Sequence, residues 1–260
     1  MNFTRNSEIE QDFQLREQNR HREFAPVWDE TLEAVFADVA PYYDIASDVA
    51  SLGLCSAWRR RFTRAIGVGA GDRVLDVCAG TNGVGIALLA RQPDIKVTAI
   101  DRSAAMQAEG GRRAKARGFS IESHVDDVHE LPFPDDSFDV VTLQFASRHL
   151  RVIDVFSEIR RVLRPGGAFY HCDMLKPENP AVRRLYGMYL KGCVAGTAMM
   201  FGSGNEARSC RDYFVRAIEL FYSEAELTRL LNGIGFHQVT SDSAPGGILA
   251  HHRAVKPQAV

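Results

Sequence analysis

The sequence predicts an α/β fold in which a mostly parallel sheet carries helices on both of its faces. Two observations support this prediction. Short apolar runs with β-branched residues alternate with longer segments whose apolar residues recur at helical spacing. A turn of small residues, 80–85, also follows the first of these runs directly. Strands that alternate with helices pair in parallel through right-handed crossovers, so we expect a ligand at the carboxyl ends of the strands.

The best-defined βαβ unit runs from Arg73 to Asp101. Residues 73–79 are expected to form a buried strand, 86–91 a helix, and 96–100 a second strand that ends on Asp101. The turn would leave backbone N–H groups free at the start of the helix. An acid about 20 residues further on is placed to bind a ribose. The unit therefore indicates an adenosine-containing ligand, with an ordinary tight βα turn as the alternative.

The following segments continue the same alternation towards the carboxyl end of the chain. Pro165, Gly166 and Gly167 are expected to turn the chain into the fifth strand. The last two strands resemble an antiparallel pair, which gives seven strands in all. The expected strands are 119–125, 138–145, 168–174, 236–243 and 247–255, and the expected helices are 103–117, 152–163, 181–201, 210–221 and 224–231.

Helical additions are expected at two places, before the sheet and after its fifth strand. Residues 1–24 are polar and are predicted to be an N-terminal extension that forms a solvated or frayed helix. Residues 25–260 are expected to form one domain, with a helical N-terminal part at 25–70 and a helical insertion on the substrate side at 181–222. An arginine cluster at 59–64 favours a solvated face, with contact to anionic lipid headgroups as the alternative.

Composition excludes several classes of function. The chain has 31 basic and 33 acidic residues and a net charge of −2, so nothing indicates a nucleic-acid partner. Residues 1–10 have no apolar core, and no run of 18 apolar residues occurs, so neither a signal peptide nor a membrane span is predicted. The 5 cysteines lack CxxC spacing, so we expect no disulfide framework, no metal site and a reducing, cytoplasmic setting.

Several short motifs occur in an order that resembles the class I S-adenosylmethionine-dependent methyltransferases and, within them, the ubiquinone/menaquinone biosynthesis C-methyltransferase (UbiE-like) family. The resemblance covers roughly Val35 to Lys256. It implies a Rossmann-like class I methyltransferase fold, S-adenosylmethionine as cofactor and an aromatic, hydrophobic small-molecule acceptor. The motifs are Phe36 to Asp44, Val74-Leu75-Asp76, Gly80-Thr81, Asp101, Leu131 to Asp135, Phe138-Asp139, Arg148, Arg161 to Gly167 and Gly246 to Arg253.

The resemblance also implies a cofactor role for particular residues. Gly80 and Thr81 would line the methionine part, and Asp101 would accept both ribose hydroxyls. Asp127 would accept the adenine amino hydrogens while the Val128 N–H meets the ring nitrogen; a turn cap is the alternative for Asp127. The remaining cofactor-binding positions are Asp76, Asn82, Arg102 and Gln144.

The sequence departs from the family pattern beside the expected reaction centre. Cys78 and Asn82 replace two glycines of the D-x-G-x-G-x-G turn, Gly83 stands where the family usually has an acid, and His149 where it often has Asn. Asn tolerates left-handed backbone, so the turn is expected to survive. These departures keep an O- or N-methyltransferase of another small molecule open as an alternative.

Two adjacent residues are the catalytic candidates. Methylation of a ring carbon requires a phenolate, whose charge Arg148 would hold and whose proton His149 would take. Structural hydrogen bonding is the alternative for both. An NAD-dependent oxidoreductase or a non-catalytic nucleotide binder is the competing class, which the lack of a full GxGxxG disfavours. Peripheral membrane contact and a homodimer are further possibilities.

Overall fold

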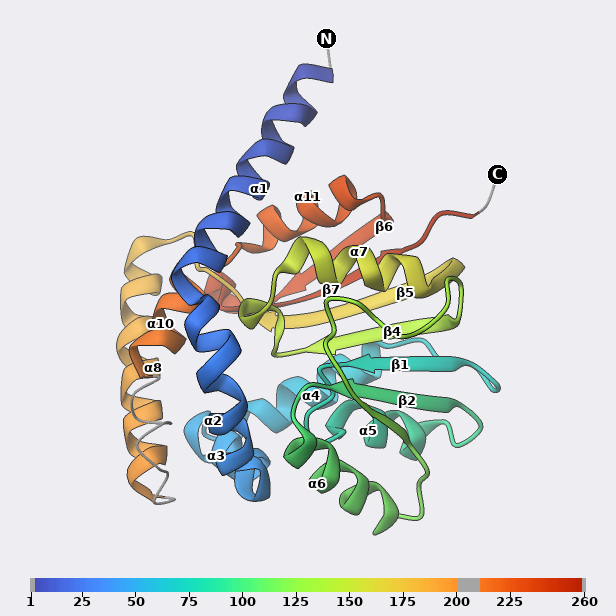
Figure 1. Ribbon diagram of the computed structural model, residues 1–260. Helices are drawn as coiled ribbons and strands as arrows, with labels where there is room; N and C mark the ends of the chain where they lie inside the picture. Colours follow the sequence, from blue (N-terminus) through green and yellow to red (C-terminus); the bar gives the residue numbers. More distant parts are fainter. Residues whose placement is uncertain (1–2, 201–210, 259–260) are drawn as a thin grey trace.

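The computed structural model describes residues 3–200 and 211–258, which build a seven-stranded sheet in the order β3-β2-β1-β4-β5-β7-β6 (Figure 1). β7 is antiparallel to its neighbours β5 and β6, and the other adjacent strands are parallel. This confirms the predicted fold. The strands are β1 Arg73–Val77, β2 Lys96–Asp101, β3 Glu122–Val125, β4 Phe138–Gln144, β5 Leu163–Met174, β6 His237–Ser243 and β7 Leu249–Val255.

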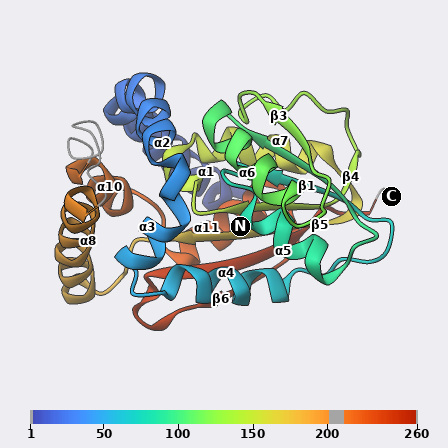
Figure 2. The same ribbon diagram turned by 90° about the horizontal axis from the view of Figure 1, so that it is seen from below.

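Helices cover both faces of the sheet, as predicted. Leu75 and Val77 of β1 belong to a core with α7 and α11, whereas Val74 belongs to a second core with α4 and α5. Figure 2 shows α4 and α7 on opposite sides of the strands. The helices around the sheet are α4 Leu54–Ala65, α5 Gly83–Arg91, α6 Ala104–Lys115, η3 Ser147–His149, α7 Val152–Val162, α11 Glu224–Ile234 and η4 Pro245–Gly247.

The additional helices gather at the carboxyl ends of the parallel strands (Figure 1). Among the described residues, these helices either precede α4 and β1 in the chain or lie between β5 and α11. These are α1 Phe3–Pro26, η1 Val27–Thr31, α2 Leu32–Val39, η2 Ala40–Tyr42, α3 Tyr43–Ala50, α8 Pro180–Met200 and α10 Arg211–Glu219. Residues 201–210 of the predicted insertion, including Phe201 and Cys210, lie outside the described residues.

The first helix differs from the prediction, because one of its faces is buried. The helical part of the prediction is confirmed, but the solvated part is wrong for Phe13, Glu17, Arg20 and Phe24, which are 1–8% exposed. These positions follow the i, i+4, i+7, i+11 spacing of one helix face. Arg20 pairs with Glu17, and Glu17 Oε2 accepts the N–H of Val152 at 2.6 Å. The helix is therefore anchored on the domain.

The fifth strand also differs from the prediction. β5 begins at Leu163, directly after α7, so the Pro-Gly-Gly sequence lies inside the strand instead of forming a turn before it. Gly166 has φ +77, and the register with β4 shifts between Phe138 and Val140. A bulge thus absorbs the turn-forming residues. No helix within residues 3–200 and 211–258 is long and apolar enough to cross a membrane.

Candidate functional site

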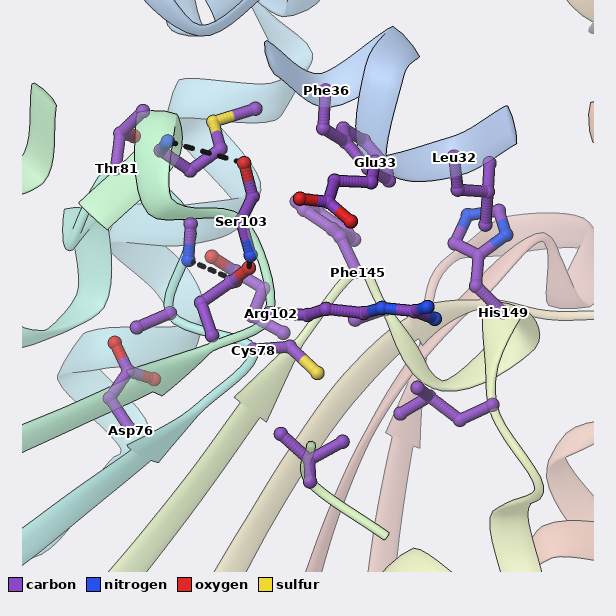
Figure 3. Close-up of a pocket in the computed structure, with 18 of the residues that line it drawn as sticks. Leu32, Glu33, Phe36, Asp76, Cys78, Thr81, Arg102, Ser103, Phe145 and His149 are labelled. Atoms are coloured by element: carbon purple, nitrogen blue, oxygen red, sulfur yellow. Dashed lines mark hydrogen bonds between the residues drawn. The ribbon is translucent and has the colours of Figure 1, made fainter. Parts of the chain in front are cut away.

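A cavity lies at the carboxyl ends of β1, β2 and β4, under the N-terminal helices (Figure 3). Most of the residues predicted from the sequence line it together, although they come from separate loops. Asn82 and Arg148 do not line it. The predicted residues in its wall are Asp76, Gly80, Thr81, Asp101, Arg102, Asp127, Val128, Gln144 and His149.

The turn after β1 is built on left-handed backbone. Cys78, Gly80 and Asn82 have φ of +53, +52 and +57. Two of these positions carry side chains, and Asn82 is one of the residues that tolerates this conformation. Gln107 Nε2 donates to Gly80 O at 3.1 Å and to Asn82 Oδ1 at 3.2 Å. Asn82 therefore holds the turn from its buried side, while Gly80 and Thr81 face the cavity.

Asp101, the last residue of β2, is oriented by two backbone donors. Gly80 N donates to Oδ2 at 2.8 Å, and Ser103 N donates to Oδ1 at 2.9 Å. Burial raises the pKa of Asp101, and these two N–H groups act against that rise. Each carboxylate oxygen keeps accepting capacity beyond its single backbone bond. Asp101 thus presents two fixed acceptors to the cavity, as a pair of vicinal hydroxyls requires.

Asp127 and Val128 follow β3 at the neighbouring edge of the cavity. The Asp127 side chain is 61% exposed, and its Oδ1 accepts from the His129 backbone at 2.9 Å and contacts His129 Nδ1 at 2.5 Å. Burial raises the pKa of Asp127, but the bonds to His129 lower it overall. Asp127 therefore caps the turn and also lines the cavity.

Asp76 lies deeper, at the buried end of the cavity (Figure 3). It is 1% exposed, and its Oδ1 accepts the Thr142 hydroxyl at 2.7 Å. Burial raises its pKa to about 6. Such a carboxylate gains from an incoming cation, because the cation stabilises the ionised form that burial disfavours.

The N-terminal helices form the opposite wall. Trp28 lies in η1, a π-helix of the kind that is frequent at functional sites, and its carbonyl accepts from Arg102 Nη1 at 2.9 Å. Trp28 and Phe36 both line the cavity. Figure 3 shows the Arg102 side chain running across the cavity towards His149. The sequence placed Phe36 in a motif of the resemblance but gave neither Phe36 nor Trp28 a role in the site.

Arg148, the predicted oxyanion partner, is committed to another group. Its Nη1 pairs with Asp173 and donates to Phe145 O at 2.8 Å, and its side chain is 10% exposed. Burial lowers its pKa, but Asp173 and surrounding tyrosines raise it overall, so the guanidinium is charged. The charge is neutralised by a fully buried carboxylate outside the cavity wall. The pairing therefore favours the structural alternative for Arg148.

His149, the predicted proton acceptor, does line the cavity. Its Nδ1 lies 2.5 Å from the hydroxyl of Tyr213 in α10, which accepts from Trp28 Nε1 at 2.8 Å. Its Nε2 is buried and has no hydrogen-bond partner. Burial, Arg148 and Arg20 lower the pKa of His149 well below its usual value, so the ring is neutral at pH 7. Nε2 is available to a ligand as a neutral hydrogen-bonding atom.

Arg59 is a site residue that the sequence reasoning missed. It was placed on a solvated helix face, but its side chain is 20% exposed, lines the cavity and pairs with Asp44 at 2.7 Å. Burial raises the pKa of Asp44, but Arg59 and Arg113 lower it overall. The signal was present in the spacing, because Arg59 follows Cys55 by four residues and precedes Phe62 by three on the buried face of α4.

Helices α8 and α10 contribute differently to the site. Tyr213 of α10 holds His149, whereas none of the described residues of α8 lines the cavity. Residues 3–200 and 211–258 contain no cluster of His, Cys, Asp or Glu that could hold a metal ion. The site thus offers an acidic, polar half on the β1–β3 turns and an aromatic half beneath the N-terminal helices.

Comparisons with known proteins agree on one family. The model of the ubiE/COQ5 methyltransferase family matches residues 25–256. A demethylmenaquinone methyltransferase of Clavibacter sepedonicus is 37% identical over 229 residues, which is 87% of this chain and 90% of that protein. The ubiquinone/menaquinone biosynthesis C-methyltransferase UbiE of Dinoroseobacter shibae is 30% identical, covering 86% and 90%.

Solved structures share the fold. The geranyl diphosphate C-methyltransferase of Streptomyces coelicolor, solved with Mg²⁺, geranyl diphosphate and S-adenosyl-L-homocysteine, superposes with a TM-score of 0.54. It is 17% identical and covers 77% of this chain and 79% of that chain. At this identity the similarity concerns the architecture of the sheet and its helices.

Proposed function

This chain belongs to the ubiE/COQ5 methyltransferase family, and from this premise we propose that it methylates a ring carbon of a quinol of the menaquinone or ubiquinone type. It is an S-adenosylmethionine-dependent methyltransferase. The proposal on the acceptor rests on relatives whose names specify demethylmenaquinone and ubiquinone/menaquinone biosynthesis. The observation that carries it in the structure is the cavity itself, which joins the oriented Asp101 carboxylate to an aromatic chamber.

The residues on the β1–β3 turns fit the cofactor. Asp101 would hold the ribose hydroxyls with the two oxygens that Gly80 and Ser103 orient. Asp127 and the Val128 N–H would meet the adenine, and the buried Asp76 would meet the ammonium group. Bound there, the cofactor supplies an electrophilic methyl group. Thr81, Arg102 and Gln144 complete this half of the proposed site, and Asn82 supports the turn from outside the cavity.

The residues of the aromatic half fit a flat, apolar ring. Trp28, Phe36 and Phe145 line it and exclude water, which favours transfer of a methyl group to carbon. With its Nδ1–H donated to the Tyr213 hydroxyl, neutral His149 would present Nε2 as the acceptor for a ring hydroxyl and its proton. The lowered pKa makes the ring a weak base for this step. Arg148 acts on this half indirectly, because its guanidinium fixes the loop that carries His149.

A transfer assay tests this proposal. Purified protein is incubated with [methyl-¹³C]S-adenosylmethionine and demethylmenaquinol that is kept reduced, and the product is examined by ¹³C NMR. We expect the label as a methyl group on a ring carbon. A methoxy signal would support the alternative, an O-methyltransferase, which the departures Gly83 and His149 from the family pattern favour. The absence of label under reducing conditions would contradict the proposed acceptor.

We also propose that the protein works in the cytoplasm at a membrane surface. The cysteines described as free, Cys55, Cys78, Cys172 and Cys193, fit a reducing compartment. Large apolar side chains are exposed on the neighbouring helices α3 and α8, among them Ile45 at 62% and Leu185 at 66%. An exposed apolar patch of this kind fits a lipid surface, with a homodimer as the alternative. Vesicle co-sedimentation and light scattering distinguish the two.

A further inference from the structure

We propose that Arg59 is the anchor for the cofactor's methionine carboxylate, and that Gly83 is the residue that admits it to this position. The inference rests on the proposed cofactor site, and it adds a cation for the carboxylate, the one anionic group of the cofactor. Arg102, the arginine that follows β2, donates instead to the Trp28 carbonyl. It is carried by the contacts of Arg59, by the local charge and by the space above Gly83.

The Asp44 carboxylate connects Arg59 to the turn that follows β1. Asp44 accepts from Arg59 Nη1 at 2.7 Å through Oδ1 and from the Thr81 hydroxyl at 2.8 Å through Oδ2. Thr81 is the turn residue that follows Gly80, whose N–H orients Asp101. The guanidinium is therefore tied to the same turn that would hold the ribose, at the side where α5 begins.

A second arginine lies close to Arg59. Asp44 is shared by two guanidinium groups, because Arg113 also pairs with its Oδ2 and donates to Thr81 O at 3.1 Å. Asp44 therefore divides its charge between the two guanidinium groups. The first backbone N–H groups of α5 lie beside them, since the first i→i−4 bond of this helix is Ile86 N to Asn82 O at 3.0 Å. Free N–H groups at a helix start add to the attraction for an anion.

Arg59 also has a donor that the protein does not use. Its Nε is buried and has no hydrogen-bond partner, although the side chain lines the cavity. A buried donor without a partner is costly, and a carboxylate on the ligand would satisfy it. The bond to Asp44 uses Nη1, so it leaves Nε to the ligand.

Gly83 provides the space in which the guanidinium lies. A Cβ atom at this position would be 2.8 Å from Arg59 Nη1 and 2.9 Å from Arg59 Cζ. These distances are too short for unbonded atoms, so any side chain at 83 displaces the end of Arg59. Gly83, which departs from the family pattern, therefore allows the Arg59 guanidinium to pack against the first residue of α5.

A ligand pair tests the assignment by binding alone. S-adenosylhomocysteine carries the carboxylate, whereas 5′-methylthioadenosine keeps the adenosine and lacks the whole amino-acid head. For Arg59→Gln we expect calorimetry to show about 10- to 100-fold weaker binding of S-adenosylhomocysteine, the loss of a charge-assisted hydrogen bond. Binding of 5′-methylthioadenosine should stay within about twofold of the wild type, because its contacts are untouched.

Gly83→Ala is a second, independent variant. Its new Cβ displaces Arg59 without removing the charge, so it should also weaken S-adenosylhomocysteine selectively. The double variant should lose no more than Arg59→Gln alone, since both act through one contact. Arg60→Gln changes an exposed arginine of the same helix and should change neither affinity. Asp101→Asn should weaken both ligands, because both carry the ribose.

The binding data distinguish the role of Arg59 from the existence of the cofactor site. Equal weakening of both ligands by Arg59→Gln would overturn the assignment, and so would unchanged S-adenosylhomocysteine binding with a raised KM for the acceptor. The second result would place Arg59 on the acceptor instead. Failure of the wild-type protein to bind either ligand would contradict the proposed cofactor site itself.

Discussion

Arg148 is paired with Asp173, and this pair lies behind the wall of the cavity and not within it. Asp173 also accepts from the Ser147 hydroxyl at 2.6 Å and from the Arg148 N–H at 3.2 Å. The carboxylate is 0% exposed, so its bonds are shielded from water. The loop that carries His149 is therefore fixed by a buried ion pair.

Removing the carboxylate of this pair should be strongly destabilising. Asp173→Asn leaves Arg148 buried without its counter-ion, and breaking a buried pair in this way costs about 3–5 kcal/mol. Urea denaturation measures the free energy of unfolding. Asp154→Asn breaks an exposed pair with Arg151 and should cost about 1 kcal/mol or less. An equal loss of unfolding free energy in the two variants would show that the buried pair stabilises the protein no more than the exposed pair.

Asp76→Asn should stabilise the protein and weaken cofactor binding. The pKa of Asp76 is about 6 in the folded protein, against 3.8 for the ordinary group, because burial penalises the charged form. The folded state thus holds an extra proton between about pH 4 and 6, and the contribution of Asp76 to stability falls as pH rises through this window. A pKa difference of about two corresponds to about 3 kcal/mol at pH 7.

Unfolding curves of wild type and Asp76→Asn at pH 4 and pH 7 measure this contribution. We expect the two proteins to differ little at pH 4 and the variant to be the more stable at pH 7, with its Thr142 contact preserved. Wild-type affinity for S-adenosylhomocysteine should fall below pH 6, as the ammonium group loses its ionised partner. A variant less stable than the wild type at pH 7 would refute the burial penalty.

Asp101→Asn should weaken S-adenosylhomocysteine binding by about 100-fold. The amide keeps the size of the carboxylate, but one of its two acceptors becomes a donor, and charge-assisted bonds to the ribose are lost. Calorimetry measures the dissociation constant. Asp94 is an exposed acid, so Asp94→Asn serves as the matched control and should leave the dissociation constant unchanged. An unaltered affinity in Asp101→Asn would reject the ribose-binding role.

His149 should not give the reaction a pH dependence near neutrality. Burial, Arg148 and Arg20 hold its pKa well below 6.5, so the ring is neutral throughout pH 6–8 and charged only at lower pH. At saturating cofactor, His149→Asn should lower kcat but leave the shape of the pH profile between 6 and 8 unchanged. A wild-type limb near pH 6.5 that disappears in the variant would contradict a neutral His149.

The sheet and the grouping of the β1–β3 turn residues around one cavity were predictable because their signals are local. A strand, a turn of small residues and an acid at the next strand end occupy fewer than 30 positions, as in Arg73 to Asp101. The partner of Arg148 was not predictable, because Asp173 lies on the next strand and only tertiary packing brings the two together. The bulge in β5 likewise depends on its pairing with β4.

The buried charges were missed for a different reason. Arg20 and Arg59 lie in arginine-rich segments, whose composition indicates a solvated face, yet each falls on the apolar stripe of its own helix. The spacing of these arginines along their helices therefore indicated burial correctly, whereas the composition of the segments indicated exposure. Each forms an ion pair with one acid, Glu17 for Arg20 and Asp44 for Arg59.

A crystal structure with S-adenosylhomocysteine tests the central claim most directly. We predict density for an adenosine between Asp101 and Asp127, with the sulfur facing the chamber formed by Phe36, Phe145 and His149. Density for the ligand elsewhere on the protein, or a cavity closed by Arg102 and Trp28 with no room for a nucleoside, would contradict it.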